Sequence, residues 1–533
     1  TGNFTIGATG DYATINAALT ALQSDGISGP VVFEIQSGTY PEQFTLGPVT
    51  GASATNTITF RSATGNAEDV TITHSAVGTA DNYVVLLENA SHYILQNIKI
   101  VAGGTTYAPT IRGQLHLQNI LIEGCILESP TANSTSGDRG NVIISASTSA
   151  DVRFINNTIT GGSYGIFYQG TNTSARSLGL VISGNTMTNI YYQGINLDRF
   201  FEAQIINNVV AIMTGSSGSS SGMVMNYVDG ALRLLGNRVT GARSYAIYFN
   251  DSQALSSAPG LIANNHIQSQ GAQASLYFYY NIRNHRIYHN SISNTSSGPA
   301  LYYHGYGASW SMGNEFINNI FNANGGYSVH VAEASGITTM DYNDLFTSGS
   351  VVGQWGNTDA GDLLAWQTLS GHDANSLSFD PQYVSDTDLT ASSAALANAG
   401  TPLSAVTTDI NGEPRKVTPS MGANEYDASA LVPMSGVYTI NASVSGERNF
   451  TTIQGAVDAM VLNGLGGSVV FEIAAGTYIE QVLVPDISGG SDVNTVTFES
   501  ASGLASDVVI QYSATSTADN YVIRLSNASD LIL

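Results

Sequence analysis

The stretch VRFINNTIT at residues 152–160 decides the fold, because closely related phrases return six more times along the chain. They read LVISGNTMT at 180–188, AQIINNVVA at 203–211, LRLLGNRVT at 232–240, GLIANNHIQ at 260–268, HRIYHNSIS at 285–293 and EFINNIFN at 315–322. Aligned on one position, the phrases share Asn157, Asn185, Asn208, Asn237, Asn265, Asn290 and Asn319, spaced by 28, 23, 29, 28, 25 and 29 residues. A period in the twenties is typical of stacked repeat units.

Each phrase predicts two short strands joined at a corner. Apolar and polar residues alternate before the asparagine, and an apolar residue returns two positions after it. A further short strand follows in every repeat, as in YGIFY at 164–168, QGINL at 193–197 and YAIYF at 245–249. This pattern indicates an all-β solenoid, a parallel β-helix in which each repeat forms one coil.

We expect the seven asparagines to sit at the corners and hold the coils together. A tight corner needs a left-handed backbone conformation, which asparagine tolerates better than most residues that carry a side chain. Neighbouring coils lie roughly 4.8 Å apart, so corner asparagines can form a hydrogen-bonded ladder.

The repeated corner resembles that of the right-handed parallel β-helix, or pectin-lyase-like, superfamily. The resemblance is carried by Asn157 and Ile159 followed by Gly165-Ile166, and again by Asn185 and Met187 followed by Gly194-Ile195. It implies the fold and leaves the activity open.

The segments on either side of the coils are expected to close the β-helix. In residues 1–45, an amphipathic helix capped by Asp11 would cover the first coil, and the turn at 38–42 resembles the opening of pectin methylesterases. We assign the coils to 46–346 and a C-terminal cap to 347–434, which resembles the closing segment of secreted bacterial β-helix proteins. Within this cap, residues 409–413 form either a calcium loop or, as we favour, a hydrogen-bonded turn.

The sequence then starts again. VVFEIAAGTYIEQ at 469–481 restates VVFEIQSGTYPEQ at 31–43, and TADNYVIRLSNAS at 517–529 restates TADNYVVLLENAS at 79–91, both with an offset of 438 residues. We therefore expect one unit in residues 1–434 and the truncated start of a second in 435–533. This tandem architecture resembles the giant repetitive cell-surface proteins of the Bacteroidota type, which implies an extracellular location and, as partners, other copies of the repeat or extracellular glycans.

Composition narrows the partners. The chain has 40 acidic and 16 basic residues and a net charge of −24, which disfavours nucleic acid and polyanionic glycans.

Its single cysteine, Cys125, allows neither a disulfide framework nor a thiolate metal site. Apart from the calcium alternative, we expect no metal or cofactor. No apolar run is long enough to cross a bilayer, so we expect no membrane insertion of this segment.

One candidate site is a stripe of aromatic side chains. Alternation along the strands points rings outward on four successive coils, at Tyr248, Tyr277, Tyr302 and His330. Four further residues widen this stripe, namely Tyr279, Tyr280, His304 and Tyr306. Exposed rings one coil apart can stack on sugars or form the centre of a protein interface. The alternative is that stacked rings only stabilise the sheet.

A second candidate site is basic and comprises Arg283, His285, Arg286, His289 and His304. In β-helix polysaccharide lyases, which the chain resembles in fold, a basic residue removes the proton beside a uronate carboxylate. The alternative is that these side chains only solvate an outer face. We therefore predict a non-enzymatic structural and adhesive module, with a polysaccharide lyase or glycoside hydrolase as the alternative.

Overall fold

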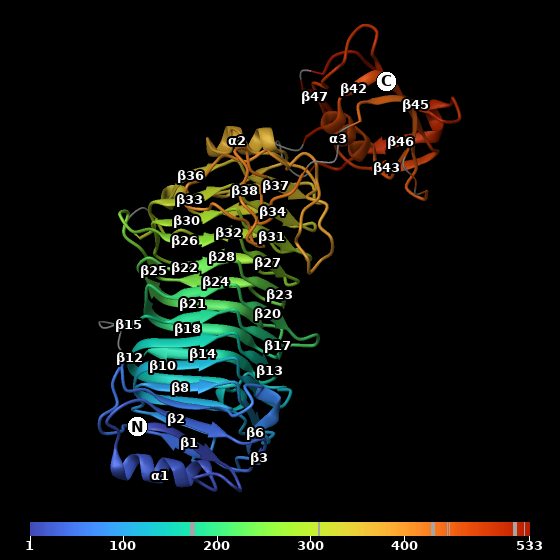
Figure 1. The fold of residues 1–533 in the computed structure, drawn as a ribbon. Coiled ribbons are helices and arrows are strands. Elements are labelled where there is room, and N and C mark those ends of the chain that lie inside the picture. Colours follow the sequence, from blue (N-terminus) through green and yellow to red (C-terminus); the bar gives the residue numbers. More distant parts are fainter. Residues whose placement is uncertain are drawn as a thin grey trace.

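The expected parallel β-helix is confirmed. The computed structural model describes residues 1–170, 176–307, 310–427, 432–444, 446, 448–514, 520–526 and 528–533. Coils stack into a rod with the N-terminus at one end (Figure 1). Strands of successive coils pair in parallel and in register along three ladders that surround one core.

Ladder 1 precedes the asparagine corner in each coil. It contains β1 (Gly2–Ile6), β2 (Val31–Ile35), β5 (Ile58–Ser62), β8 (Tyr93–Gln96), the second halves of β10 (Ile111–Glu123) and β12 (Val142–Ile155), β16 (Val181–Ser183), β19 (Gln204–Ile206), β22 (Arg233–Leu235), β26 (Gly260–Ala263), β30 (His285–Tyr288), β33 (Asn314–Ile317) and β36 (Ile337–Asp341).

Ladder 2 carries the predicted aromatic stripe. It contains β4 (Phe44–Leu46), β7 (Val85–Glu88), the first halves of β10 and β12, β14 (Tyr164–Gly170), β18 (Gln193–Phe201), β21 (Ser221–Asp229), β24 (Ile247–Asn250), β28 (Leu276–Phe278), β32 (Leu301–Tyr303), β35 (Val329–Val331) and β38 (Gly353–Trp355). The short strands β15 (Ser177–Leu178), β25 (Ser252–Gln253) and β29 (Ile282–Arg283) lie beyond its edge.

Ladder 3 follows the corner. It contains β3 (Gly38–Tyr40), β6 (Val70–His74), β9 (Lys99–Ala102), β11 (Ile126–Glu128), β13 (Thr158–Thr160), β17 (Thr186–Ile190), β20 (Val209–Ile212), β23 (Arg238–Ala242), β27 (His266–Ser269), β31 (Ser291–Asn294), β34 (Ile320–Ala323) and β37 (Asp344–Thr347). Its inward side chains are apolar and have no exposed surface, for example Ile159, Met187 and Val210.

A helix covers the first coil. α1 (Ile15–Asp25) buries Ile15, Leu19 and Leu22 against the core. Its N-cap is Thr14, whose side chain accepts a hydrogen bond from Ala17 N. Asp11, which we expected to cap the helix, instead accepts hydrogen bonds from Thr5 through its carboxylate. The Glu42 carboxylate accepts from the first backbone N–H groups of the helix, which fixes the helix against the turn.

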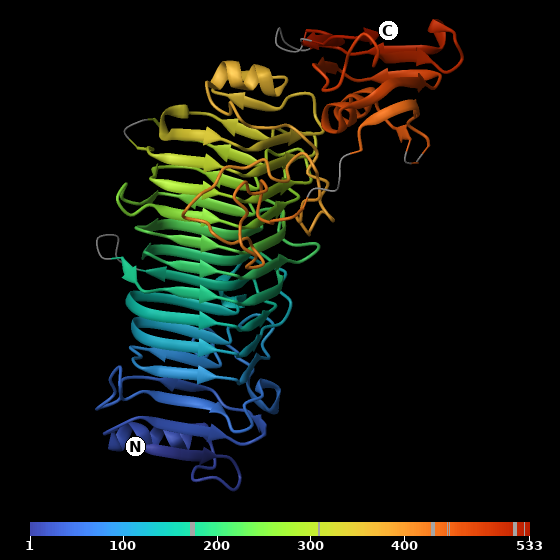
Figure 2. The same cartoon turned by 45° about the horizontal axis from the view of Figure 1, so that its top comes forward.

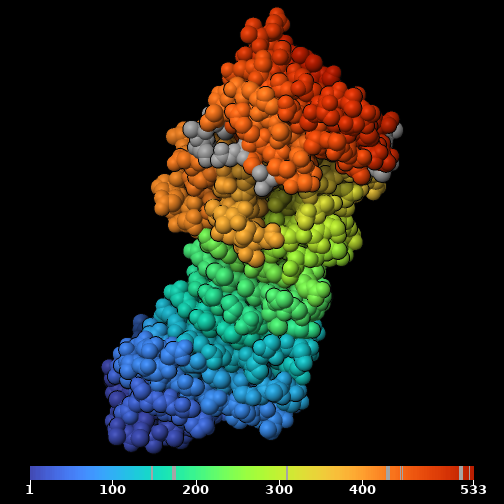
Figure 3. All heavy atoms as spheres, turned by 90° about the vertical axis from the view of Figure 1, so that its right-hand side faces the viewer, coloured from blue at the N-terminus to red at the C-terminus, as the bar shows by residue number. Residues whose placement is uncertain are grey.

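The C-terminal cap differs from expectation. The last coil is closed by the hairpin of β38 and β39 (Thr358–Ala360) and by α2 (Leu363–Ser370), whose Trp366 is fully buried. Residues 371–427, here called the strap, run back along the flank of the upper coils (Figures 2 and 3). The strap covers apolar side chains that point outward from ladder 1, with Val406 packed on Leu261 and Tyr288.

The C-terminal segment forms sheets and a core of its own. It contains β40 (Met434–Ile440), β41 (Asn449–Phe450), α3 (Ile453–Asn463), β42 (Leu465–Ile473), β43 (Gly476–Ile479), β44 (Val482–Pro485), β45 (Val496–Ser500), β46 (Val508–Gln511), β47 (Ile523–Ser526) and β48 (Leu531–Ile532). It repeats the cap geometry of the first unit, since the Glu480 carboxylate accepts from the first N–H groups of α3 as Glu42 does for α1. Arg524 Nη1 lies 2.8 Å from Asp362 Oδ2 at the start of α2. Every helix in the described residues is too short or too polar to span a membrane.

The asparagines form a continuous buried ladder. Each Oδ1 accepts from both the backbone N–H and the side-chain Nδ2 of the asparagine one coil earlier, at 2.9 and 3.0 Å between Asn237 and Asn265. Each Nδ2 also donates to a ladder 1 carbonyl of the coil before, as Asn237 does to Ile205 O at 2.9 Å. The ladder continues through an eighth asparagine, Asn343, which the sequence analysis missed.

The left-handed residue of the corner is one position earlier than expected. Positive φ occurs at the residue that precedes each ladder asparagine, namely Asn156, Gly184, Asn207, Gly236, Asn264, His289, Asn318 and Tyr342. The expectation that the ladder asparagines are themselves left-handed is therefore wrong. The preceding residue makes the turn, which leaves the ladder asparagine free to direct its amide along the rod axis.

Replacing Asn237 by Ala should lower the free energy of unfolding by about 1–3 kcal/mol, because Ile205 O and the Asn208 amide lose their partner in a buried site. Replacing Asn207 by Gly should have a much smaller effect, since Gly184 and Gly236 fill the same corner position in other coils. Denaturant titration measures both variants. Equal losses would contradict the separation of the two roles.

Candidate functional site

The predicted stripe lies on the outer side of ladder 2. Strand pairing places Phe167, Asn196, Val224, Tyr248, Tyr277, Tyr302, His330 and Gln354 in one unbroken row, one residue per coil. Four successive positions of this row, from Tyr248 to His330, are aromatic. The structure divides the aromatic side chains here into two sets with different geometry.

The first set is a closed stack of Tyr245, Tyr277, Tyr302 and His330. Successive ring centroids lie 5.0, 4.8 and 4.2 Å apart, with interplanar angles of 18°, 22° and 14°. Tyr277 is only 8% exposed, because Tyr245 and Tyr302 cover both of its faces. The expectation of an exposed Tyr277 is therefore wrong, and this burial raises its pKa above the ordinary tyrosine value. Ring faces that cover one another stabilise neighbouring coils and offer little to a ligand.

The second set is open, and we call it the open aromatic group: Tyr279, Tyr280, His304, Tyr306 and Trp310. Tyr306 and Trp310 are 46% and 48% exposed. Tyr306 stands nearly perpendicular to Tyr280, at 79° and 5.2 Å, while Tyr280 and Trp310 are tilted by only 34° at 5.4 Å. The rings thus pack against one another at angles, and part of the Tyr306 and Trp310 side chains remains open to solvent.

The backbone of this group is held in an unusual conformation. Three consecutive residues, Gly305, Tyr306 and Gly307, have positive φ angles of 86°, 67° and 85°. A tyrosine in this region costs about 1–2 kcal/mol relative to an ordinary conformation. Arg283 Nε donates to Trp310 O at 3.0 Å, which ties the end of the loop to the coil below. The sequence analysis named Tyr280 and Tyr306 but missed Trp310, although the Gly-Tyr-Gly signal was visible.

The predicted basic set does not converge. His285 and His289 have no exposed surface, because His285 points into the core and donates toward Ser252 O, while the strap covers His289. Arg286 lies 3.9 Å from Glu315 beside a hollow of about 290 Å³, and His304 belongs to the open aromatic group. Burial lowers the pKa of His285 to about 4, so this ring is neutral near pH 7.

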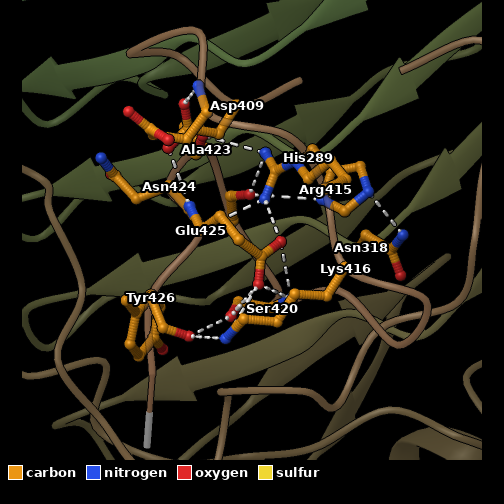
Figure 4. A network of polar contacts seen from close by, with 12 residues as sticks. His289, Asn318, Asp409, Arg415, Lys416, Ser420, Ala423, Asn424, Glu425 and Tyr426 are labelled. Atoms are coloured by element: carbon orange, nitrogen blue, oxygen red, sulfur yellow. Dashed lines mark hydrogen bonds and ion pairs between the residues drawn. The ribbon is translucent and has the colours of Figure 1, made fainter. Parts of the chain in front are cut away.

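His289 belongs to a buried network between coils and strap (Figure 4). Its Nε2 accepts from Asn318 Nδ2 at 2.8 Å, and its Nδ1 lies 3.3 Å from Gly422 O. Arg415 donates to the carbonyls of Gly422 and Ala423 and lies 3.5 Å from Glu425. This network fastens the strap to the corners of the coils.

Asp409 also belongs to this network. Its Oδ1 accepts from the N–H groups of Asn411 and Glu413 at 2.8 and 2.9 Å, and its Oδ2 accepts from Glu425 N at 3.0 Å. Both oxygens therefore face N–H donors, as expected of the hydrogen-bonded turn favoured from the sequence.

A second polar cluster lies on ladder 2 two coils before Tyr248. Asp198 Oδ2 binds Arg199 Nη1 at 2.7 Å, and Arg176 lies 2.8 Å from Asp229. Both guanidinium groups lie within 6.0 Å of the Tyr227 ring centre. Each side chain of the two ion pairs is no more than 22% exposed.

Comparison with known proteins places the chain among β-helix proteins. The model of the family described as "Periplasmic copper-binding protein (NosD)" matches residues 54–327, and no curated protein matches the chain. Among solved structures, XylC in complex with xylose is 11% identical, with 80% of this chain and 99% of that chain covered and a TM-score of 0.46. Pectate lyase Pel9A is 12% identical, with coverage of 80% and 97% and a TM-score of 0.41. The A-module of mannuronan C-5 epimerase AlgE6 from Azotobacter vinelandii is 10% identical, with coverage of 69% and 95% and a TM-score of 0.39. At this level of similarity these structures carry no argument about activity.

Replacing His289 by Asn should make folding less sensitive to acid. Burial, with the Arg415 charge adding to it, holds the pKa of His289 well below its ordinary value, so below about pH 6.5 only the unfolded chain takes up the proton. The stability that depends on the neutral ring is present above that pH and is lost as pH falls. The variant should therefore gain on the wild type by about 1.4 kcal/mol per pH unit below 6.5 in denaturant titrations. Asn fits the site because Asn156, Asn207 and Asn264 fill the same corner in other coils. Parallel pH curves would contradict a buried neutral His289.

Proposed function

Because this chain belongs to the NosD family of right-handed β-helix proteins, we propose that it is a structural and adhesive module of the cell envelope, displayed at the cell surface. The module contacts its partners through the open aromatic group. The observation that carries this proposal is the exposure of Tyr306 and Trp310 on a rigid rod, next to a stack whose rings are closed.

Exposed aromatic rings are more typical of a surface that binds a partner than of a surface that contacts only solvent. Tyr and Trp supply large apolar area together with a polar edge, and they are enriched where proteins bind ligands or other proteins. Tyr306 is moreover held in a left-handed conformation between two glycines. A fold that stabilises this strain and exposes the ring gains nothing from it as an isolated molecule, so the benefit lies in contact.

The enzymatic alternative is less well supported. A general base has to reach the proton that it removes. His285 and His289 have no exposed surface, so neither reaches a polysaccharide outside the rod. Arg283, Arg286 and His304 lie on the outside, but Arg286 is next to Glu315 and His304 stacks on Tyr306.

The family description names copper, and the His, Cys, Asp and Glu side chains that the structure describes form no cluster that fits a copper site. Copper favours imidazole together with thiolate or thioether sulfur. Across the residues that the structure describes, no three His, Cys, Asp or Glu side chains gather closely enough to hold a metal ion. Cys125 is buried at the start of the asparagine ladder, with Sγ 3.5 Å from Leu95 O, and burial raises its pKa to about 12. We derive no copper chemistry for this chain.

Tandem repetition strengthens the adhesive interpretation. The 438-residue offset and the recurrence of the cap in residues 435–533 support an array of similar units, in which other copies are neighbours. An array multiplies weak contacts, because each bound unit raises the effective concentration of the next one. Modest affinity at each aromatic group is then sufficient for firm attachment.

Replacing Tyr279, Tyr306 and Trp310 together by Ser should abolish attachment to cells or extracellular glycans, or self-association, because a few buried aromatic side chains carry most of the energy of a contact. The thermal unfolding midpoint should change little, since the ladder is untouched. Replacing Tyr83 and Tyr107, which are partly exposed on early coils, by Ser is the matched control and should leave attachment intact.

A panel of polysaccharides incubated with the wild type should yield no products. Turnover that disappears on replacing His285 or His289 by Asn would contradict the proposal in favour of the enzyme. So would a triple serine variant that still attaches as firmly as the wild type.

A further inference from the structure

The strap depends on the coils for its structure. All strap residues are described, and they contain no helix and no strand longer than an isolated bridge, so contacts with the rod hold the strap in place. The strap covers apolar side chains that point outward from the coils, among them Leu261, Tyr288 and Ile320. Two histidines lie at the same seam, because His266 and His289 are no more than 1% exposed and each contacts a strap residue.

We infer that the strap, from residue 379 onward, is a pH-sensitive latch that closes on the coils near neutral pH and is released by acid while the coils stay folded. The position of the two imidazoles carries this inference. Each ring is sealed between a coil and the strap, so it meets water only when the strap leaves. Release uncovers the apolar face of the upper coils. The inference goes beyond the proposed function and does not depend on the open aromatic group.

His266 lies on β27 under the end of the strap. Its Nε2 is 2.8 Å from Asn424 Oδ1. Arg238 precedes it by one coil in the same row, and Asp388 and Asp409 face it from the strap. Burial is the largest effect and lowers the pKa of His266 to about 4, although the Asn424 contact and the two carboxylates favour the charged ring. Once the strap leaves, this ring takes up a proton near pH 6.5.

His289 occupies the corner of a later coil. Its Nε2 accepts from Asn318 Nδ2 at 2.8 Å, and its Nδ1 lies 3.3 Å from Gly422 O of the strap. Protonation of Nε2 would set two N–H donors against each other, which is costly in a buried site. Arg415, 3.5 Å from Glu425, is the charged strap residue that faces the ring. Burial and then this positive charge hold the pKa of His289 well below its ordinary value.

One buried carboxylate acts with the opposite sign. Asp344 on β37 accepts from Phe379 N of the strap at 2.8 Å through Oδ1, whereas its Oδ2 has no hydrogen-bond partner in the described part of the chain. Tyr383 and Tyr426 face it from the strap. Burial raises the pKa of Asp344 well above its ordinary value, and the negative charge of Asp380 adds to this effect. Asp344 therefore keeps its proton under the closed strap at a pH where it ionises once the strap leaves, above about pH 4.

These signs set the pH at which the latch holds best. As pH falls below about 6.5, each histidine takes up a proton on release, which lowers the closing constant about tenfold per pH unit for each ring. Asp344 loses a proton on release above about pH 4, so its effect raises the closing constant about tenfold per unit as pH falls. Asp373 stays with the coils, because Asn343 and Trp366 donate to it. The two histidines outweigh the one carboxylate below about pH 6.5 and only the carboxylate acts above it, so the closing constant peaks near pH 6.5.

Hydrogen exchange of the full 533-residue chain, followed by mass spectrometry from pH 4.5 to 8, measures the closing constant as a protection factor. Peptides with the amides of Ile410 and Gly422, which donate to Ala423 O and Asn318 O, report on the strap, and peptides of β13 and β17 report on the coils. Strap protection in the wild type should fall about tenfold per pH unit below 6.5, and coil protection should not change.

Substitution at the seam should change the slope in sign as well as in size. His266→Gln combined with His289→Asn leaves only Asp344 to titrate, so strap protection should rise about tenfold per unit as pH falls. Either single variant should show almost no slope between pH 4.5 and 6.5. Asp344→Asn should steepen the fall toward a hundredfold per unit. His116→Gln, on β10 of an early coil, is the matched control and should keep the slope of the wild type.

Three results would overturn the inference. The first is strap protection that does not change with pH, and the second is loss of strap and coil protection together, which would make the strap part of one cooperative unit with the rod. The third is a wild-type slope in the double variant. If the double variant does not fold, the single variants and Asp344→Asn decide, since a wild-type slope in all of them contradicts the latch equally.

Discussion

The hydrogen-bonded asparagine ladder is the constraint on which the rest of the structure depends. From Asn157 to Asn343, every amide is bonded to the coil before and the coil after, in a site with almost no exposed surface. Because an unpaired amide is costly there, each coil has to keep its neighbour in register. Cys125 begins the ladder with its backbone N–H on Asn157 Oδ1, and Asp373 and Ser376 end it at Asn343. Loop length then varies between coils without disturbing the strands.

Because the coils are in register, a residue type that recurs in the sequence forms a continuous row on the surface. Once the corners are fixed, residues at the same position in ladder 2 lie one coil apart, which brings Tyr277 and Tyr302 into stacking contact at 4.8 Å. Wherever aromatic residues recur at this position, the register set by the asparagine ladder places their rings in a closed stack. Register alone does not position the open aromatic group, because its rings lie after the strands, in loops of irregular length. Gly305 and Gly307 give the backbone the conformation that presents Tyr306, and Arg283 fixes Trp310.

The fold could be read from the sequence because the relevant physics is periodic. Spacing predicted the solenoid and the ladder positions, since both depend on one residue type that returns at regular intervals, and the amphipathic pattern of residues 15–22 predicted the terminal helix. Two features escaped because they depend on contacts distant in sequence. Burial of His289 is set by a strap residue, Gly422, more than a hundred positions later. Tyr277 is buried by rings on the neighbouring coils and not by its own strand. Alternation assigns a side chain to a face, but it does not say what later covers that face.

For the same reason, aromatic content alone did not distinguish the stacked rings of the stripe from the exposed ones. Tyr302 and Tyr306 are four residues apart, yet Tyr302 lies within a stack and Tyr306 is 46% exposed. The difference comes from backbone conformation, since paired strands place their outward rings over one another from coil to coil, whereas Tyr306 lies in a left-handed turn outside the strands. In this stacked-coil protein, the glycine on each side of Tyr306 therefore indicates an exposed ring more clearly than the row of rings within the strands does. In such proteins, a binding function is best sought in loops where the regular strand pattern is interrupted.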